Sequence, residues 1–262
     1  MADADFRAER RTSTAMPLPN KVALVLQGGG ALGSYQAGVY QALHEQGIEI
    51  DRVAGISIGG INAAIIAGNP PELRSKRLSA FWERVSSWMP SFPMPTDHDK
   101  WREYLHEISA GFVAMVGVPG FFGPRFVPPM LAQPGTPDAL SFYDATPLRK
   151  TLDDLIDWDL LNDGPIELSV GAVNIRSGNL RFFSNRKERL DARHIIASGA
   201  LPPGLPPVEI DGELWWDGGI VSNTPLQHLL DQDERLNTLV FQVDLFSARG
   251  ALPRDIQDVM GR

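Results

Sequence analysis

The sequence G-I-S-I-G at residues 55–59 has the G-x-S-x-G spacing of a serine nucleophile held on a sharp turn between a strand and a helix. A short apolar strand is expected directly before it, and a small, apolar helix is expected over 58–67. Such a turn exposes the serine hydroxyl, and the following helix directs its N-terminal amides towards negative charge that forms nearby. Ser57 is therefore the candidate nucleophile, and Gly55 and Gly59 leave room around it.

A second glycine-rich turn, G-G-G-A-L-G at residues 28–33, follows an apolar run over 21–27. Its G-x-G-x-x-G spacing is also that of dinucleotide-binding turns, which require an acidic residue at the end of the second strand. Asp51 has about the right spacing but precedes that strand. If the two strands are adjacent and parallel, the same turn would instead offer backbone N–H groups to an oxyanion beside Ser57. Both interpretations of the turn are open at this point.

A serine nucleophile needs a general base, and two kinds of residue could provide one. Four histidines follow Ser57, at 98, 106, 194 and 228, and His228 is the strongest of them as a catalytic candidate. Asp217 is the better candidate, because it ends an expected strand in W-W-D-G-G, where apolar rings would desolvate the carboxylate and raise its pKa. The alternative is that Asp217 only caps its own turn.

Composition narrows the classes of protein. The 262 residues are 43% hydrophobic and 21% charged, with a net charge of −8 and no cysteine. These values predict a globular chain that repels nucleic acid, and they exclude disulfides and thiolate catalysis. The histidines have no metal-ligand spacing, so neither a metal nor another cofactor is expected. Without a signal-like or membrane-spanning segment, we expect a cytoplasmic protein.

The elements predict a single α/β domain over 21–262, preceded by a flexible arm at 1–20. Strands are expected at 21–27, 53–56, 166–175, 180–184, 208–210, 213–216 and 239–245; helices are expected at 34–46, 58–67, 146–156, 191–198 and 225–232. A further helix is expected after 71, with one apolar stripe made of Leu78, Phe81, Trp82, Val85 and Met89. In the first helix, Tyr35, Val39 and Leu43 share a face, and Gly38 is expected to allow close packing on the sheet. Asp211-Gly212 is a strong hairpin signal.

An irregular insertion is expected at about 89–143. Within it, the stretch 111–130 is rich in Phe and Val but is interrupted by Gly and Pro, which a regular core element would not tolerate. We interpret this stretch as a mobile apolar lid or an acyl-chain wall, and an irregular core plug is the alternative.

Taken together, the motifs resemble those of the patatin-like phospholipase family. The resemblance covers roughly 21–245 and includes the turn at 28–33, the elbow at 55–59 continued by G-I-N-A, the stretch A-S-G-A-L-P at 197–202, and D-G-G at 217–219 followed by N-T-P. It implies a three-layer α/β/α sandwich with a mostly parallel central sheet. It also implies a serine acyl hydrolase that cleaves lipid acyl esters, either as a phospholipase A or as a neutral esterase, without a cofactor.

By this resemblance Ser57 is the nucleophile and Asp217 is its base. The amides of Gly28, Gly29 and Gly30 form the oxyanion hole, and Gly33, Gly55, Gly59, Gly218 and Gly219 support the motifs. Many members carry Arg or Lys at the position of Leu32, which favours neutral esters here. Transient contact with a lipid surface is expected, and the oligomeric state is left open. Two other functions stay open, a nucleotide-binding protein and a non-catalytic interaction protein.

Overall fold

The computed structural model describes residues 19, 21–86, 117–231, 237–246 and 252. Its strands are β1 (Lys21–Leu26), β2 (Arg52–Ile56), β3 (Gly123–Pro124), β4 (Tyr143–Asp144), β5 (Glu167–Asn174), β6 (Leu180–Ser184), β7 (Val208–Ile210), β8 (Glu213–Asp217) and β9 (Thr238–Val243). Its α-helices are α1 (Ser34–Glu45), α2 (Ile58–Ala67), α3 (Pro71–Ser86), α5 (Thr146–Leu155), α6 (Trp158–Asp163), α7 (Ala192–Ser198) and α8 (Leu226–Leu230). Short 3-10 turns lie at Gly30–Gly33, Pro129–Leu131, Pro137–Ala139 and Gly218–Ile220.

A 7-stranded sheet with the order β7-β8-β5-β2-β1-β9 forms the centre of the fold, and β6 also pairs with β5. The strands β5, β2, β1 and β9 run parallel, whereas β6, β7 and β8 pair in antiparallel fashion. The sequence of β1 is a continuous apolar run because both of its faces are covered, and Leu24 and Leu26 are fully buried. The predicted α/β class with a mostly parallel sheet is confirmed.

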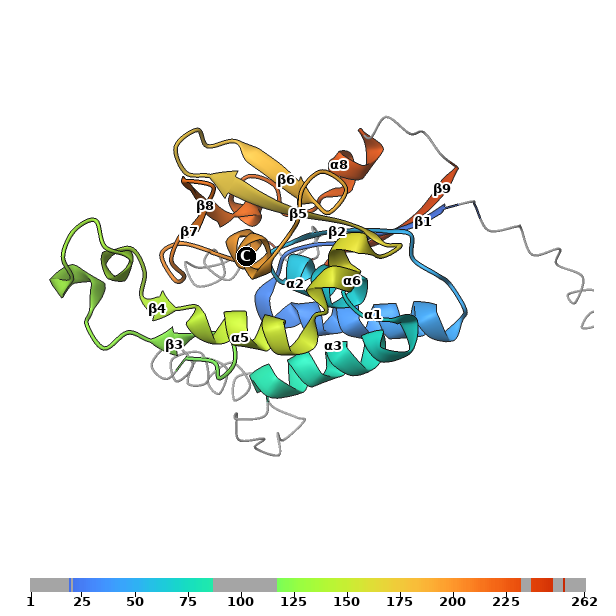
Figure 1. The fold of residues 1–262 in the computed structure, drawn as a ribbon, viewed down its shortest axis with the longest axis horizontal. Coiled ribbons are helices and arrows are strands. Elements are labelled where there is room, and N and C mark those ends of the chain that lie inside the picture. Colours follow the sequence, from blue (N-terminus) through green and yellow to red (C-terminus); the bar gives the residue numbers. More distant parts are fainter. Residues whose placement is uncertain (1–18, 20, 87–116, 232–236, 247–251, 253–262) are drawn as a thin grey trace, which may run out of the picture.

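Helices flank the sheet unequally. Helices α1, α2, α3, α5 and α6 lie on one face, and α8 lies on the other (Figure 1). Helix α2 packs directly on β1, β2 and β5, and α7 packs beside α2 on β5. All ten residues of α2 are buried, so this helix is apolar throughout rather than amphipathic.

The two partners of β5 on one of its edges explain where the site forms. Strand β2 pairs with β5 up to Ile56 opposite Gly171, and β8 runs in the opposite direction until Asp217 faces Ala172. Strand β6 pairs with residues of β5 that also pair with β2 or with β8, so β6 must lie on the opposite edge of β5 from those two strands. Strands β2 and β8 therefore meet end to end, with their carboxyl ends facing each other.

Both predicted hairpins are confirmed. Strands β5 and β6 are joined through a turn with Gly178 at φ 71°, and β7 and β8 are joined through Asp211 at φ 53° and Gly212 at φ 79°. Two successive positive φ values are the geometry of a type I′ turn, which the Asp-Gly dipeptide favours. This hairpin brings the strand that ends at Asp217 back onto β5.

The prediction for the packing face of α1 was right for Val39 and Leu43, which pack against the core, and wrong for Tyr35 and Gly38. Tyr35 is exposed and Gly38 has open space around its Cα, whereas Gln36 and Tyr40 are buried. Gln36 turns inward because its side-chain amide bonds to backbone and side-chain groups beneath the glycine turn. A polar residue thus takes a place that a hydrophobic pattern would assign to an apolar one.

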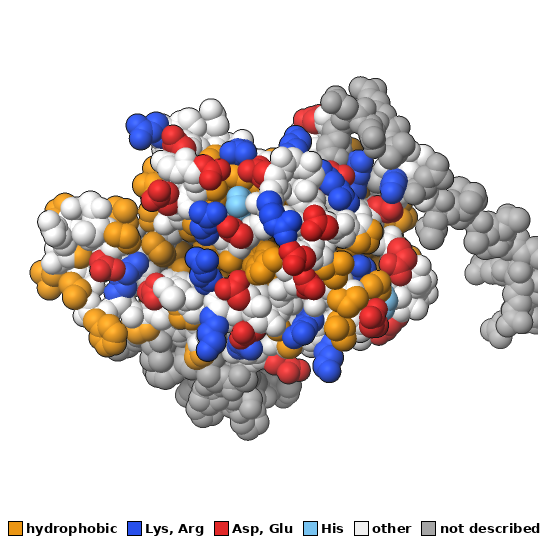
Figure 2. Space-filling view, in the orientation of Figure 1, with side chains coloured by type: hydrophobic (Ala, Val, Ile, Leu, Met, Phe, Trp, Pro, Cys, Tyr) orange, Lys and Arg blue, Asp and Glu red, His pale blue; other side chains and the backbone are white. Residues whose placement is uncertain are grey.

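The described part of the insertion, 117–143, lacks regular structure apart from β3, β4 and 3-10 turns. Its residues 125–142 extend to the left end of the molecule in Figure 1, and hydrophobic side chains are exposed on this protrusion (Figure 2). Residues 1–18, 20 and 87–116, which include most of the expected arm and the first six residues of the expected lid, lie outside the described residues. Among the described helices, none combines the length and apolar character needed to cross a membrane.

Candidate active site

Ser57 sits on a strained turn between β2 and α2. Its backbone has φ 55° and ψ −125°, a conformation that non-glycine residues rarely adopt. Ser57 is the N-cap residue of α2, and its carbonyl accepts the N–H groups of Gly60 and Ile61. The hydroxyl is therefore presented at the positive end of a buried helix, as the G-x-S-x-G spacing predicts.

The two glycines of this turn are required by close backbone approaches. A Cβ on Gly55 would lie 2.3 Å from the carbonyl oxygen of Gly59. A Cβ on Gly59 would lie 2.3 Å from the carbonyl oxygen of Leu26, at the end of β1. The elbow is thus packed against itself and against the neighbouring strand.

Ser198 holds the turn from the other side. The Ser57 N–H donates to both the backbone oxygen and the hydroxyl of Ser198, each at 3.0 Å. Ser198 ends α7 and is fully buried. The following loop reaches Asp217, whose N–H donates to the carbonyl of Ala200 at 3.0 Å. A single segment therefore contacts both candidate catalytic residues.

Asp217 lies next to Ser57. Only 2% of Asp217 is exposed, and its carboxylate accepts hydrogen bonds from the Ser57 hydroxyl and from the Gly219 N–H, the latter at 2.7 Å. Gly218 makes this approach possible, because a Cβ there would lie 2.5 Å from the carbonyl oxygen of Gly171. Residues separated by 160 positions in the chain are thus in contact because β2 and β8 meet along β5.

Burial raises the pKa of Asp217 above its ordinary value of 3.8. The hydrogen bonds from Gly219 and Ser57 act in the opposite direction, because they stabilise the ionised carboxylate. Burial is the larger effect. A carboxylate with a raised pKa accepts a proton more readily than an exposed one, so this pair can transfer a proton from the hydroxyl to the carboxylate.

The glycine turn lies against Ser57 as the parallel pairing of β1 and β2 predicts. A Cβ built on Gly28 would lie 3.1 Å from the Cβ of Ser57. However, the Gly28 N–H already donates to the carbonyl of Asn223 at 3.1 Å, so it is not available to an oxyanion in this conformation. Among the described residues, the N–H groups of Gly29 and Gly30 have no partner, so two of the three expected donors are unpaired.

Asn223 and Gln27 fix the base of this turn. The Asn223 side chain donates back to the carbonyl of Gly28 at 2.9 Å, so the two residues exchange a pair of hydrogen bonds. The side chain of Gln27 donates to Thr224 and accepts the N–H of Leu245 at 2.6 Å. The N-T-P sequence after D-G-G was a visible signal for Asn223, but nothing in the sequence indicated the role of Gln27.

An apolar cavity of about 290 Å³ adjoins the glycine turn. Gly30 and Ala31 of the turn and Ile58, the residue after the candidate nucleophile, line one side of it. The rest of the lining comes from α3 and from the start of the described insertion: Phe81, Trp82, Val85, Ser86, Val118, Phe121 and Phe122. The insertion residues expected in a lid or acyl-chain wall thus include three that line this cavity.

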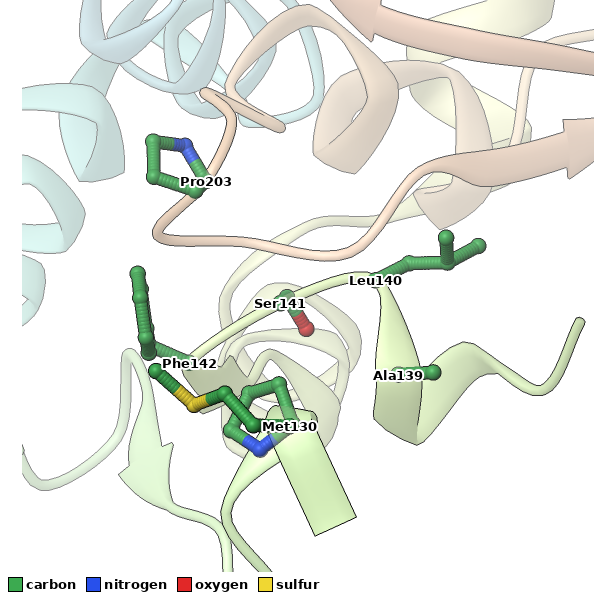
Figure 3. A pocket seen from close by; sticks show the side chains of 7 residues that line it. Met130, Ala139, Leu140, Ser141, Phe142 and Pro203 are labelled. Carbon is green, nitrogen blue, oxygen red and sulfur yellow. The ribbon is translucent and has the colours of Figure 1, made fainter. Parts of the chain in front are cut away.

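A second hollow of about 240 Å³ lies between the protrusion and the loop that follows Ser198. Figure 3 shows Pro203 of that loop facing Phe142 and Met130 of the insertion. The two segments are joined by hydrogen bonds from Phe142 N–H to the Pro203 carbonyl and from Tyr143 N–H to the Gly204 carbonyl. The protrusion is therefore attached to the same loop that contacts Ser57 and Asp217.

The other candidates from the sequence lie elsewhere. The ring of His228 stacks on Phe182 with centroids 3.9 Å apart, and burial lowers its pKa to about 4. His194 belongs to the N-terminal cap of α7 with Asp191, and His98 and His106 lie outside the described residues. Asp51 accepts from Lys21 and from the Val22 N–H, at the opposite end of the sheet from the glycine turn. The described residues contain no group of three or more His, Asp or Glu that could hold a metal ion.

Comparison with known proteins points to one family. The family model described as patatin-like phospholipase matches residues 24–230. The patatin-like phospholipase domain-containing protein ZK370.4 of Caenorhabditis elegans is 28% identical over 79% of this chain and 12% of its own length. The lysophospholipase NTE1 of Cryptococcus neoformans is 27% identical over 91% of the chain and 12% of its own length. The chain thus spans about an eighth of these curated relatives. The structure of VipD from Legionella pneumophila aligns with 86% of this chain and 50% of its own length, at 20% identity and a TM-score of 0.49.

Proposed function

Because the chain belongs to the patatin-like phospholipase family, we propose that it cleaves lipid acyl esters with Ser57 as nucleophile and Asp217 as its base. The observation that carries the proposal is the hydrogen bond from the Ser57 hydroxyl to a buried carboxylate whose pKa is raised. Asp217 takes the hydroxyl proton while the serine oxygen attacks the ester carbonyl, and it gives that proton to the alcohol oxygen as the ester C–O bond breaks, which leaves an acyl-enzyme and a free alcohol. Water then attacks the acyl carbonyl while Asp217 takes a proton from it, and the proton returns to the serine oxygen as the fatty acid is released.

Charge on the carbonyl oxygen would be stabilised by the free N–H groups of Gly29 and Gly30. Each belongs to a turn next to Ser57, and backbone amides cost no reorganisation when the oxyanion forms. Losing one such donor reduces kcat by about 10²–10³-fold in hydrolases of this kind. The pairing of the Gly28 N–H with Asn223 is the reason to assign this role to two glycines rather than three.

We assign the acyl chain to the apolar cavity beside Gly30. Its lining is almost entirely hydrophobic, and it starts at the turn that carries the proposed oxyanion donors. Leu32 is half exposed at this turn, in place of a cation, which favours a neutral ester over one with a phosphate next to the scissile bond. A monoacylglycerol is therefore the first substrate to test, with a lysophospholipid as the comparison.

A fluorophosphonate probe tests the nucleophile directly. We expect the wild-type chain to be labelled on the peptide that contains Ser57, and Ser57→Ala to lose both labelling and ester hydrolysis. Asp217→Asn should reduce hydrolysis by about 10³-fold or more, since the amide cannot accept the proton. Asp211→Asn, an exposed residue in the hairpin turn, is the matched control and should keep full activity. Labelling of another serine, or equal hydrolysis by Ser57→Ala, would contradict the proposed chemistry.

We also propose that the protrusion at 125–142 contacts a lipid surface. Phe126, Met130 and Leu131 are almost fully exposed there, with side chains that water solvates poorly. Arg125 forms an ion pair with Asp138 and donates a hydrogen bond to Ser141, so these contacts join the two ends of the protrusion. The positive and negative charges of the ion pair cancel, so the pair adds no net charge to the protrusion. An uncharged apolar surface on a chain of net charge −8 suits a zwitterionic or neutral lipid interface.

Vesicle flotation tests this contact separately from catalysis. The triple variant Phe126→Ser, Met130→Gln, Leu131→Gln should bind phosphatidylcholine vesicles about tenfold less than the wild type. Its hydrolysis of a water-soluble short-chain ester should be unchanged. Leu230→Gln, which alters an exposed leucine on α8, is the control and should bind vesicles normally. If the triple variant binds as the wild type does, the protrusion is not the contact surface.

A further inference from the structure

A pair of buried amide side chains lies beneath the glycine turn. Gln36 is 1% exposed on α1, and Asn62 is 0% exposed on α2. Buried amides are costly unless their donors and acceptors are paired, and a hydrophobic pair of similar size would avoid that cost. Their presence in an otherwise apolar layer therefore calls for a reason beyond packing.

The two amides bond to both ends of the turn. Gln36 Nε2 donates to the carbonyl of Gln27 at 2.7 Å, just before the glycines. Asn62 Nδ2 donates to the carbonyl of Gly33 at 2.9 Å, at the end of the motif. The same Asn62 nitrogen donates to Gln36 Oε1 at 2.9 Å, which joins the two contacts into one network.

We propose that Gln36 and Asn62 are positioning residues that hold the 28–33 turn with the Gly29 and Gly30 amides directed at the oxyanion. The inference rests on the proposed function for its effect on rate, whereas the positioning itself can be measured without catalysis. Gly30 has φ 55° and open space around its Cα, so no side chain packs against that residue. Gly29 lies close to Leu245 and Phe246, and the hydrogen bonds from Gln36 and Asn62 restrain the two ends of the turn.

The network also reaches the apolar cavity. Trp82 Nε1 donates to Asn62 Oδ1 at 3.2 Å, and Trp82 lines the cavity assigned to the acyl chain. The indole ring thus borders the cavity while its N–H bonds to the Asn62 side chain. The acyl chain of a bound substrate would pack on Trp82, which is hydrogen-bonded to Asn62. Substrate binding in the cavity and the geometry of the glycine turn are therefore linked through the Trp82 side chain.

Steady-state kinetics distinguishes a positioning role from a merely structural one. Gln36→Met keeps the length of the side chain but removes the donor to Gln27, and we expect kcat to fall by about tenfold or more. KM for the same ester should change by less than about threefold, since the substrate's own contacts remain. A value of kcat within about twofold of the wild type would overturn the proposal.

The chain offers a matched control in Asn162. This residue is also a buried asparagine with three hydrogen bonds, donating to the carbonyls of Trp158 and Leu190 and accepting the Leu190 N–H, but it lies on α6. Asn62→Leu and Asn162→Leu should both lower stability, and only Asn62→Leu should lower kcat per folded molecule. If both variants lose kcat equally, a general loss of packing accounts for the effect and the proposal is wrong.

Hydrogen–deuterium exchange provides a measurement that does not depend on activity. Amides of the segment 28–33 should exchange faster in Gln36→Met than in the wild type, and at the wild-type rate in Asn162→Leu. Equal activity of Ser57→Ala and the wild type would refute the proposed function, whereas unchanged exchange at 28–33 would refute the positioning role. Trp82→Phe keeps an aromatic cavity wall but removes the indole donor, and should give a smaller change of the same sign even if Gln36→Met does not fold.

Discussion

At the scale of single residues, the chemistry depends on the environment of one carboxylate. Asp217 is almost fully buried, and the hydrogen bonds described for its carboxylate come from Gly219 and Ser57. Burial favours the protonated form and raises the pKa, and two donors keep the ionised form accessible. An exposed aspartate would be too weak a base for this role, so the dry end of β8 is as important as the residue type.

The pH profile of hydrolysis follows from this pKa. Asp217 must be ionised to accept the serine proton, so activity is lost as pH falls through its raised pKa. We expect the acid limb of kcat/KM to be centred above 3.8, the ordinary value for an aspartate. The measurement is the initial rate of hydrolysis of an uncharged ester at about ten pH values between roughly pH 3.5 and pH 8. A limb centred at or below 3.8 would contradict the role of burial.

At the scale of elements, close backbone packing decides which glycines can be replaced. Gly59 lies in the first turn of α2 against the end of β1, whereas Gly38 lies in the middle of α1 with nothing within 4 Å of an added Cβ. The first position belongs to the elbow, and the second has no structural need for glycine. Helix interiors otherwise favour alanine over glycine by about 0.5–1 kcal/mol.

Two alanine substitutions should therefore have opposite effects. Gly38→Ala should raise the free energy of unfolding by about 0.5–1 kcal/mol and leave activity unchanged. Gly59→Ala should lower it by about 2 kcal/mol or more and abolish hydrolysis, because the new methyl group would overlap a backbone oxygen of β1. Urea denaturation of both variants, followed by an ester assay, measures these effects. A harmless Gly59→Ala would mean that the elbow relaxes without cost.

The attachment of α8 to the sheet should depend on pH through His228. Its ring stacks on Phe182, and burial together with nearby Lys187 lowers its pKa to about 4, against a small opposing effect of Asp231. A histidine with a lowered pKa binds fewer protons when folded, so its contribution to stability is present above its ordinary pKa and is lost as pH falls from 6.5 towards 4.

His228→Phe keeps an aromatic ring against Phe182 but cannot be protonated. Between pH 7 and pH 4 the wild type should therefore lose about 2 kcal/mol more stability than this variant does. Thermal or urea unfolding at a series of pH values gives the comparison. Parallel pH curves for the two proteins would show that His228 does not cause the dependence. Activity at pH 7 should be equal, since no described contact joins His228 to Ser57.

At the scale of the whole molecule, charge and apolar exposure select the surface that the chain can approach. Its net charge of −8 opposes binding to anionic lipid, while the 125–142 protrusion offers exposed hydrophobic side chains that need no counter-charge. The segment 198–203 bonds to Ser57 through Ser198 and to the protrusion through Pro203, so a lipid surface held at one end of the molecule would lie beside a segment that borders the site.

Lipid charge should therefore control the rate on vesicles. A neutral fluorogenic ester embedded in phosphatidylcholine vesicles should be hydrolysed faster than the same ester in vesicles that contain phosphatidylglycerol. Added salt at about 0.1–0.5 M should reduce this difference in rate. Salt screens the repulsion between the chain and the anionic lipid over distances longer than the Debye length, which is about 10 Å at 0.1 M and shorter at higher salt. The control is a water-soluble ester without vesicles, whose hydrolysis should not follow lipid charge. Faster hydrolysis in the anionic vesicles would contradict the inferred preference.

The sequence by itself determined the local units of this protein. The apolar runs of β1 and β2, each followed by a glycine turn and a helix, and the Asp-Gly hairpin were all predicted, because strand periodicity and turn chemistry act between neighbouring residues. The same patterns indicated Ser57 and Asp217 as candidates, and the parallel pairing of the two strands, which could only be assumed from the sequence, is present in the structure.

Only the tertiary structure decided how these units meet. Strand β8 ends against β2 on one edge of β5, and this contact between distant segments is what buries Asp217 beside Ser57. Pairing of the Gly28 amide with Asn223 and the inward turn of Gln36 depend in the same way on partners far along the chain. Hydrophobic periodicity carries no information about which polar groups will find each other, so such contacts are visible only in three dimensions.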